Sequence, residues 1–121
     1  MTNPVLLGNL KILFNPHTVA VIGASENPDK LGSHVMRSLT SGGFRGTIVP
    51  VNPGAKSIMG LRAFSSLEEF PGEIDLAIVV LPAKLVPGIF HECSLKKVKG
   101  IVLISAGFRE IDDSQGAVLQ K

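Results

Sequence analysis

Four short apolar runs, rich in β-branched residues, recur along the chain with room for a helix between neighbours. They cover residues 18–24, 47–51, 75–81 and 100–104. The runs are almost continuously apolar, which is typical of strands covered on both faces, as in a parallel sheet. Pro50 in the second run indicates a strand end or an edge strand, because proline cannot donate to a β-ladder.

Helical spacing separates these runs. Residues 31–39 carry apolar side chains on one helical face and are followed by Gly42-Gly43, which would end the helix. A second apolar stripe covers residues 85–93, with Pro87 in its first turn, where proline is tolerated. The sequence therefore predicts an α/β fold: a Rossmann-like, doubly wound parallel sheet with helices on both faces. The last strand is expected to be missing, because the final helical segment has no stop signal.

The segments that follow the four runs are the candidate binding residues. In a sheet of this kind a ligand binds beyond the carboxyl ends of the strands, where the strand order reverses. Those segments are residues 23–33, 52–56, 81–84 and 105–108.

The first of these segments favours an anion. Backbone N–H groups at a helix start lack intrahelical partners, and the helix dipole is positive there. Gly23 permits a sharp turn, and Gly32 permits close approach of another backbone or a pyrophosphate. Ser25 and Ser33 could add hydroxyl donors, and Lys30 a positive charge. The simpler alternative is a tight turn with no ligand.

The glycine spacing and the second segment narrow the choice of ligand. Neither the Gly-x-Gly-x-x-Gly dinucleotide fingerprint nor a Walker-type Gly-Lys-Ser/Thr is present. Where NAD-binding folds usually place Asp or Glu for the ribose hydroxyls, this chain has Asn52-Pro53, with Lys56 beyond. A lysine suits an extra phosphate on the ribose. NADP and coenzyme A both carry one, so these residues leave both ligands open.

Composition excludes several classes of partner. The net charge is only +2, and Trp and Tyr are absent, so we expect no nucleic-acid partner. The apolar runs fall well short of the roughly 20 residues that span a bilayer, so we expect no membrane partner.

The few potentially reactive side chains predict no catalytic or metal-binding residue. Cys93 is the sole cysteine and lies on an apolar helical stripe, which favours core packing and a reducing, cytoplasmic setting. His17, His34 and His91 have no Ser, Cys or Asp partner at a spacing that indicates a triad.

A set of short motifs follows in one order along the chain. It comprises LFNP at 13–16, VAVIGAS at 19–25, KLG at 30–32, PVNP at 50–53, Gly60, EIDLA at 73–77, VLP at 80–82 and ISAGF at 104–108. The ordered set resembles the opening of ADP-forming acetyl-CoA synthetases. That family also includes the α subunit of succinyl-CoA synthetase and bacterial protein acetyltransferases that carry the same module.

The resemblance implies that residues 1–121 form one CoA-binding domain of a longer acyl-CoA ligase, whose other domains or subunit would be its partners. It implies that the CoA phosphates bind around Ser25 and 30–33, that adenosine and its ribose phosphate meet residues 52–56, and that 81–82 and 104–106 line the path to the thiol. The predicted CoA-binding residues are Gly23, Ala24, Ser25, Lys30, Leu31, Gly32, Ser33, Asn52, Pro53, Lys56, Leu81, Pro82, Ile104, Ser105 and Ala106.

Several functions stay open at this point. The family's phosphorylated histidine lies in a following domain, so this chain alone is expected to bind CoA and to catalyse nothing. The alternatives are the CoA-binding part of a protein acetyltransferase, a stand-alone CoA-binding protein and an NADP-binding oxidoreductase domain. An open sheet edge would also permit homo-oligomers.

Overall fold

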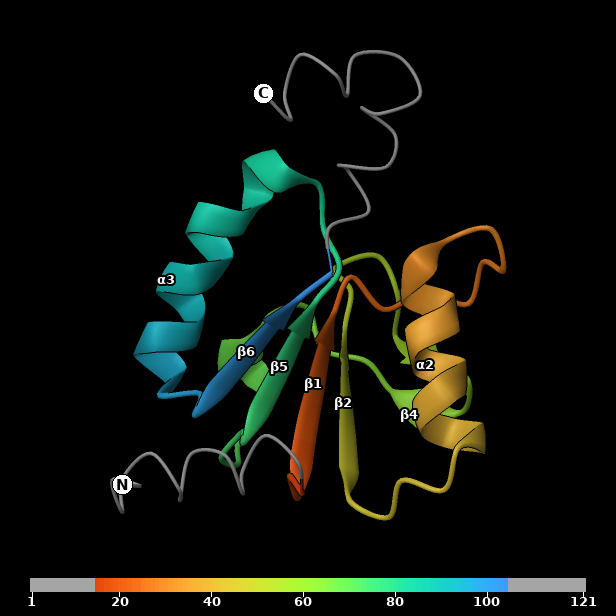
Figure 1. The fold of residues 1–121 in the computed structure, drawn as a ribbon. Helices are drawn as coiled ribbons and strands as arrows, with labels where there is room; N and C mark the ends of the chain where they lie inside the picture. The colour runs from red at the N-terminus through yellow and green to blue at the C-terminus, as the bar shows by residue number, and fades with distance from the viewer. Residues whose placement is uncertain (1–14, 105–121) are drawn as a thin grey trace, which may run out of the picture.

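The computed structural model describes residues 15–104, which form a four-stranded parallel sheet between helices (Figure 1). The sheet order is β2-β1-β5-β6. Its strands are β1 (Thr18–Ile22), β2 (Thr47–Val51), β5 (Leu76–Val79) and β6 (Gly100–Leu103). Helix α2 (Leu31–Ser41) connects β1 to β2, and α3 (Val86–Lys96) connects β5 to β6. The predicted Rossmann-like α/β fold is confirmed, and Pro50 lies on an edge strand, as its sequence position indicates.

Alternate residues of the central strand β1 point into two separate cores. Val21 packs in one core with Met36 of α2, and Ile22 packs in the other with Cys93 of α3. All four side chains are buried, and each buried side chain of this size contributes about 1.5–3 kcal/mol through removal of apolar surface from water. The helices therefore cover opposite faces of the sheet, as the doubly wound prediction requires (Figure 1).

Cys93 behaves as a core residue. Its side chain is 1% exposed. Burial, with the charge of neighbouring Glu92, raises the pKa of the Cys93 thiol to about 11. The thiol is therefore protonated at neutral pH and packs as a small apolar group, which confirms the prediction from its helical stripe.

Helix α3 contacts the sheet over a narrower stripe than the sequence predicts. Ile89 packs beside Cys93, but Leu85 and Phe90 are 49% and 44% exposed. Leu85 belongs to the short 3₁₀ turn η2 (Ala83–Leu85) that precedes α3. The stripe prediction was wrong for these two residues: Leu85 lines a cavity instead of the core, and Phe90 lies outside both the core and that cavity.

A small hairpin lies between β2 and the 3₁₀ helix η1 (Leu67–Glu69), in a region where the sequence pattern predicts no strand. Strands β3 (Ser57–Ile58) and β4 (Leu61–Arg62) pair antiparallel. The turn residues Met59 and Gly60 have φ of 53° and 81°, and two positive values identify the tight type I′ turn that suits a two-residue hairpin. Ile58 is 1% exposed and packs into the α2-side core, so the hairpin is part of the packed structure.

Asp75 joins the amino ends of β1 and β5. Its Oδ2 accepts hydrogen bonds from the backbone N–H groups of His17 and Thr18 at 2.8 and 3.2 Å, and the Lys99 ammonium lies 3.3 Å from its Oδ1. Desolvation raises the pKa of this carboxyl, but the two backbone donors and Lys99 together outweigh it. The pKa of Asp75 therefore lies below its ordinary value of 3.8, and folding favours the charged form.

We expect Asp75→Asn to lower the free energy of unfolding by about 2 kcal/mol at pH 7, because charge-assisted hydrogen bonds are stronger than neutral ones. The folded pKa lies below the unfolded one, so the carboxylate's contribution is complete above the unfolded pKa and is lost as pH falls through the folded pKa. Denaturant unfolding of both proteins from pH 7 to about pH 2 should show a difference that shrinks in acid. A difference that is constant over this range would contradict the assignment.

None of the helices within residues 15–104 combines the length and the apolar character needed to cross a membrane.

Candidate ligand-binding site

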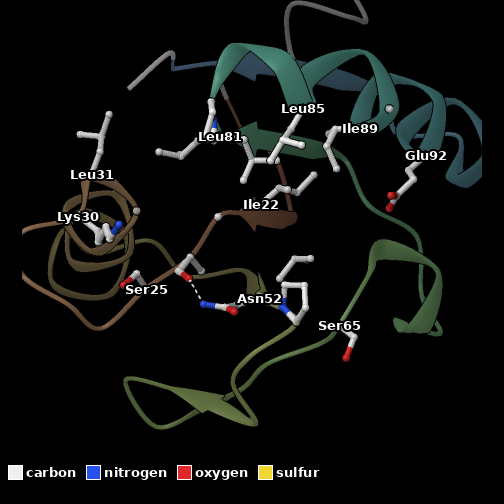
Figure 2. A pocket seen from close by; sticks show the side chains of 18 residues that line it. Ile22, Ser25, Lys30, Leu31, Asn52, Ser65, Leu81, Leu85, Ile89 and Glu92 are labelled. Atoms are coloured by element: carbon white, nitrogen blue, oxygen red, sulfur yellow. Dashed lines mark hydrogen bonds between the residues drawn. The ribbon is translucent and has the colours of Figure 1, made fainter. Parts of the chain in front are cut away.

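A cavity of about 650 Å³ opens at the carboxyl ends of β1 and β5. The chain passes from β1 to β2 on one side and then to β5 on the other side of β1, so the strand order reverses there. We call it the switch-point cavity. It is lined by 18 residues (Figure 2). They are Ile22, Gly23, Ala24, Ser25, Lys30, Leu31, Gly32, Val51, Asn52, Pro53, Ser65, Val80, Leu81, Pro82, Leu85, Gly88, Ile89 and Glu92.

Most of the predicted binding residues meet in this cavity. The predicted residues that line it are Gly23, Ala24, Ser25, Lys30, Leu31, Gly32, Asn52, Pro53, Leu81 and Pro82. Ser33, Lys56 and Ile104 do not line it. Ser105 and Ala106 lie outside the described residues.

The three residues outside the lining have different surroundings. Ser33 is 0% exposed, and its hydroxyl oxygen accepts a 3.5 Å hydrogen bond from the Arg37 guanidinium. Lys56 is exposed, and its carbonyl oxygen accepts the Ala63 N–H at the base of the hairpin. Ile104 follows β6 and donates its N–H to the Val79 carbonyl oxygen at 2.9 Å.

Two glycines that line the cavity let three backbone segments meet there. Gly23 has φ of 95°, and a Cβ built there would lie 2.1 Å from the Val80 carbonyl oxygen. A Cβ at Gly32 would lie 1.9 Å from the Gly23 carbonyl oxygen. Both distances are far inside van der Waals contact, so only glycine permits the end of β5, the turn after β1 and the start of α2 to pack this closely.

The loop before α2 is shaped by its own short side chains. The Ser25 Oγ accepts the Asn27 N–H, the Asn27 Oδ1 accepts the Asp29 N–H, and the Lys30 N–H donates to the Asn27 carbonyl oxygen, each at 2.9 Å. Such local bonds favour turns over helix. Ser25 uses only an oxygen lone pair here, so its O–H can still donate to a ligand.

The start of α2 supplies the positive end of the cavity. Leu31 and Gly32 are the first helical residues, so their N–H groups have no acceptor within the helix. The first turn contains no acidic residue, and Lys30 makes no side-chain cap bond. Helix dipole, backbone donors and the Lys30 ammonium therefore favour an anion at this end of the cavity.

Asn52 joins the loop after β2 to the loop after β1 (Figure 2). Its Nδ2 donates to the Ala24 carbonyl oxygen, and its Oδ1 accepts the Gly54 N–H, each at 2.8 Å. Both ends of the amide are therefore used inside the protein. Asn52 positions the two loops relative to each other, in addition to lining the cavity.

The sequence reasoning missed the wall opposite the phosphate-favouring end. Leu85, Ile89 and Glu92 line that wall from one helical face, and their spacing of four and three residues was a signal that could have identified it. Ser65 lines the same end, and no sequence motif distinguishes it.

The described residues do not point to metal chemistry. Between residues 15 and 104, no three His, Cys, Asp or Glu side chains gather as a potential metal site. His17, His34 and His91 are all exposed.

The cavity combines an anion-favouring end with an apolar wall, an arrangement suited to binding an elongated phosphorylated ligand.

Curated relatives place the chain among proteins that handle coenzyme A. It is 42% identical to ADP-forming acetate–CoA ligase II of Archaeoglobus fulgidus, over 93% of this chain and 17% of that protein. It is 43% identical to the α subunit of ADP-forming acetate–CoA ligase I of Pyrococcus furiosus, over 93% of this chain and 25% of that subunit. The chain thus spans a quarter or less of these two relatives. It also covers 67% of the uncharacterized protein YneT of Bacillus subtilis, at 34% identity.

A similar solved structure also comes from a protein named for coenzyme A chemistry. The apo form of a dinucleotide-forming acetyl-coenzyme A synthetase from Ca. Korarchaeum cryptofilum superposes with a TM-score of 0.78 at 39% identity, over 88% of this chain and 23% of that chain. Residues 17–120 match the family described as CoA binding domain. Of the two ligands that the residues left open, this favours coenzyme A over NADP. The chain therefore belongs to the family of CoA-binding domains.

Proposed function

We propose that the domain holds coenzyme A in the switch-point cavity and presents its thiol to other parts of an ADP-forming acyl-CoA ligase. The observation that carries the proposal is the pairing of an anion-favouring end, built from Lys30 and the first turn of α2, with an apolar wall in one cavity. Relatives from Archaeoglobus fulgidus, Pyrococcus furiosus and Methanocaldococcus jannaschii are named as ADP-forming acetate–CoA ligases, which supports the assignment of the parent enzyme.

In this proposal the pyrophosphate lies at the turn between β1 and α2. The N–H groups of Leu31 and Gly32 donate to it, together with the Ser25 hydroxyl and the Lys30 ammonium. These donors line one end of the cavity, and backbone donors at a helix start are a common phosphate-binding arrangement.

The adenosine then extends past the end of β2. Pro53, on the loop that Asn52 fixes, lines the cavity, and we assign the ribose 3′-phosphate to Lys56, three residues further along this exposed loop. The pantetheine arm leaves past Leu81 and Pro82, which line the cavity after β5. Ile104, Ser105 and Ala106 remain predicted contacts on the path to the thiol.

The parent ligase supplies the chemistry, and the domain alone binds CoA without turnover. We propose that further parts of that ligase cover β6, which is the edge strand of the sheet within residues 15–104 and has Ile101, Val102 and Leu103 exposed. Homo-oligomers formed through the same edge are the alternative, and sedimentation of the domain with and without the rest of the ligase distinguishes the two. A cytoplasmic location fits the buried, reduced Cys93.

Calorimetric titration with CoA, dephospho-CoA, NADP and NAD tests the proposed function. We expect CoA to bind most tightly, and Lys56→Ala to weaken CoA by about fivefold to tenfold while leaving dephospho-CoA unchanged, because only CoA carries the 3′-phosphate. Arg45→Ala, which removes an exposed cation from the loop before β2, is the matched control and should change neither ligand. Tighter binding of NADP than of CoA would overturn the proposal.

A further inference from the structure

Two charged side chains line the switch-point cavity, and their charges have opposite signs. Among the 18 lining residues only Lys30 and Glu92 carry a charge. Lys30 precedes α2, and Glu92 lies in the second turn of α3, at the other end of the cavity (Figure 2). The cavity is therefore polarised along its length, with an anion favoured at one end and disfavoured at the other.

The space next to Glu92 suits a ring. Leu85 and Ile89 lie on the same face of the α3 segment, and Val51 at the end of β2 belongs to the same lining. Side chains of this kind pack against the faces of an aromatic ring, while a polar group at the ring edge needs a partner.

The Glu92 carboxylate is available for such a partner. Its side chain is half-buried. The salt bridges within residues 15–104 are made by Lys99, and Lys96, one helical turn beyond Glu92, donates to the Phe70 carbonyl oxygen. An ionised carboxylate only accepts hydrogen bonds, so the ligand group that it recognises must be a donor and cannot be a phosphate.

We propose that Glu92 accepts a hydrogen bond from the 6-amino group of the adenine ring of CoA and thereby fixes the direction in which the ligand lies. The inference rests on the proposed function and deepens it. The phosphates lie at the Lys30 end, so the adenosine that extends past β2 places its ring between Val51 and the Leu85–Ile89 face. The amino edge then points toward Glu92, and a reversed ligand would bring phosphate toward this carboxylate.

A thermodynamic cycle that combines one substitution in the protein with one change in the ligand tests the role of Glu92. Wild type and Glu92→Ala are each titrated with CoA and with a CoA analogue whose purine lacks the 6-amino group. We expect wild type to prefer CoA by about tenfold, as for a hydrogen bond to a charged group, and Glu92→Ala to bind the two ligands within about twofold of each other. Glu92→Gln, which keeps an acceptor oxygen, should retain part of the preference.

Glu73→Ala is the matched control, because it removes an exposed carboxylate that lines neither the switch-point cavity nor the second hollow beside Glu92. It should keep the full preference for the amino group, and thermal unfolding of each variant verifies the fold. An equal preference for CoA in wild type and Glu92→Ala would overturn this inference alone. Failure of the wild type to bind CoA at all would overturn the proposed function as well.

Discussion

Gly32→Ala is expected to destabilise the domain by more than about 3 kcal/mol and to abolish CoA binding. The added methyl group would lie 1.9 Å from the Gly23 carbonyl oxygen, and the next nearest atoms are also backbone. No side-chain rotation can relieve this contact, so α2 must move away from the turn after β1. Overpacking against backbone is among the mechanisms that give the largest effects of single substitutions.

Denaturant unfolding of wild type and Gly32→Ala measures the effect, with circular dichroism as the probe. Gly88→Ala is the control for stability, because a Cβ there meets nothing within 4 Å and alanine is favoured over glycine in a helix by up to about 1 kcal/mol. Gly88→Ala should therefore unfold at an equal or higher denaturant concentration. Near-wild-type stability of Gly32→Ala would show that the close contact between α2 and the turn after β1 is not present in solution.

The parts of the fold that the sequence predicts well are those in which one local pattern agrees with the packing. The run TIVPV coincides with β2 (Thr47–Val51), because a parallel strand covered on both faces is apolar throughout. The apolar stripe of α2 is confirmed for the same reason, since Met36 and its neighbours face a single core.

The parts that local patterns miss depend on contacts between distant segments. The hairpin strands β3 and β4 have two residues each, which is too short to show a periodic pattern, and Ile58 is buried in a core that it shares with residues of β1 and α2. Phe90 lies on the predicted stripe of α3, yet it is exposed while its neighbour Ile89 packs against the core. Ser33 has the spacing of a phosphate donor, but it is buried in the first turn of α2 and does not line the cavity.

In the candidate site, too, the sequence predicts the part that depends on a local pattern and misses the part that depends on contacts between distant segments. The turn after β1 could be predicted because glycines, a helix start and a lysine fall together in the sequence. The sequence predicts every cavity-lining residue of this turn and of the start of α2, but not Ile22 at the end of β1. The wall formed by Leu85, Ile89 and Glu92 lies more than 30 residues after Val51 and Asn52 in the chain, although it lines the same cavity. Only the topology brings these residues opposite Val51 and Asn52.

Asn52→Asp should reduce the affinity for CoA by about 30-fold to 100-fold at neutral pH, with a smaller loss of stability. The Asn52 Nδ2 donates to the Ala24 carbonyl oxygen at 2.8 Å, and an ionised carboxylate has no proton to donate there. Two acceptor oxygens would then face each other, and the loop after β1 would lose the bond that positions it. The new charge would also repel the phosphates of the ligand.

Two comparisons separate the effect of the added charge in Asn52→Asp from the effect of the lost hydrogen-bond donor. Asn52→Ala removes the donor without adding charge, so it should cost only about tenfold in affinity. Because a carboxylate at this place suits ribose hydroxyls, Asn52→Asp should also lower the ratio of CoA affinity to NAD affinity by more than Asn52→Ala does.

The pH dependence of Asn52→Asp gives the most direct test of this account. The facing carbonyl oxygen and the bound phosphates both disfavour the charged form of the introduced group, so ligand binding should raise its pKa. Affinity should therefore recover as pH falls from 7 to about 5, since the protonated carboxyl can again donate to Ala24, whereas Asn52→Ala has no group at this position to titrate. Parallel pH profiles for the two variants, measured by calorimetry, would show that Asn52 does not hold the two loops in the binding conformation.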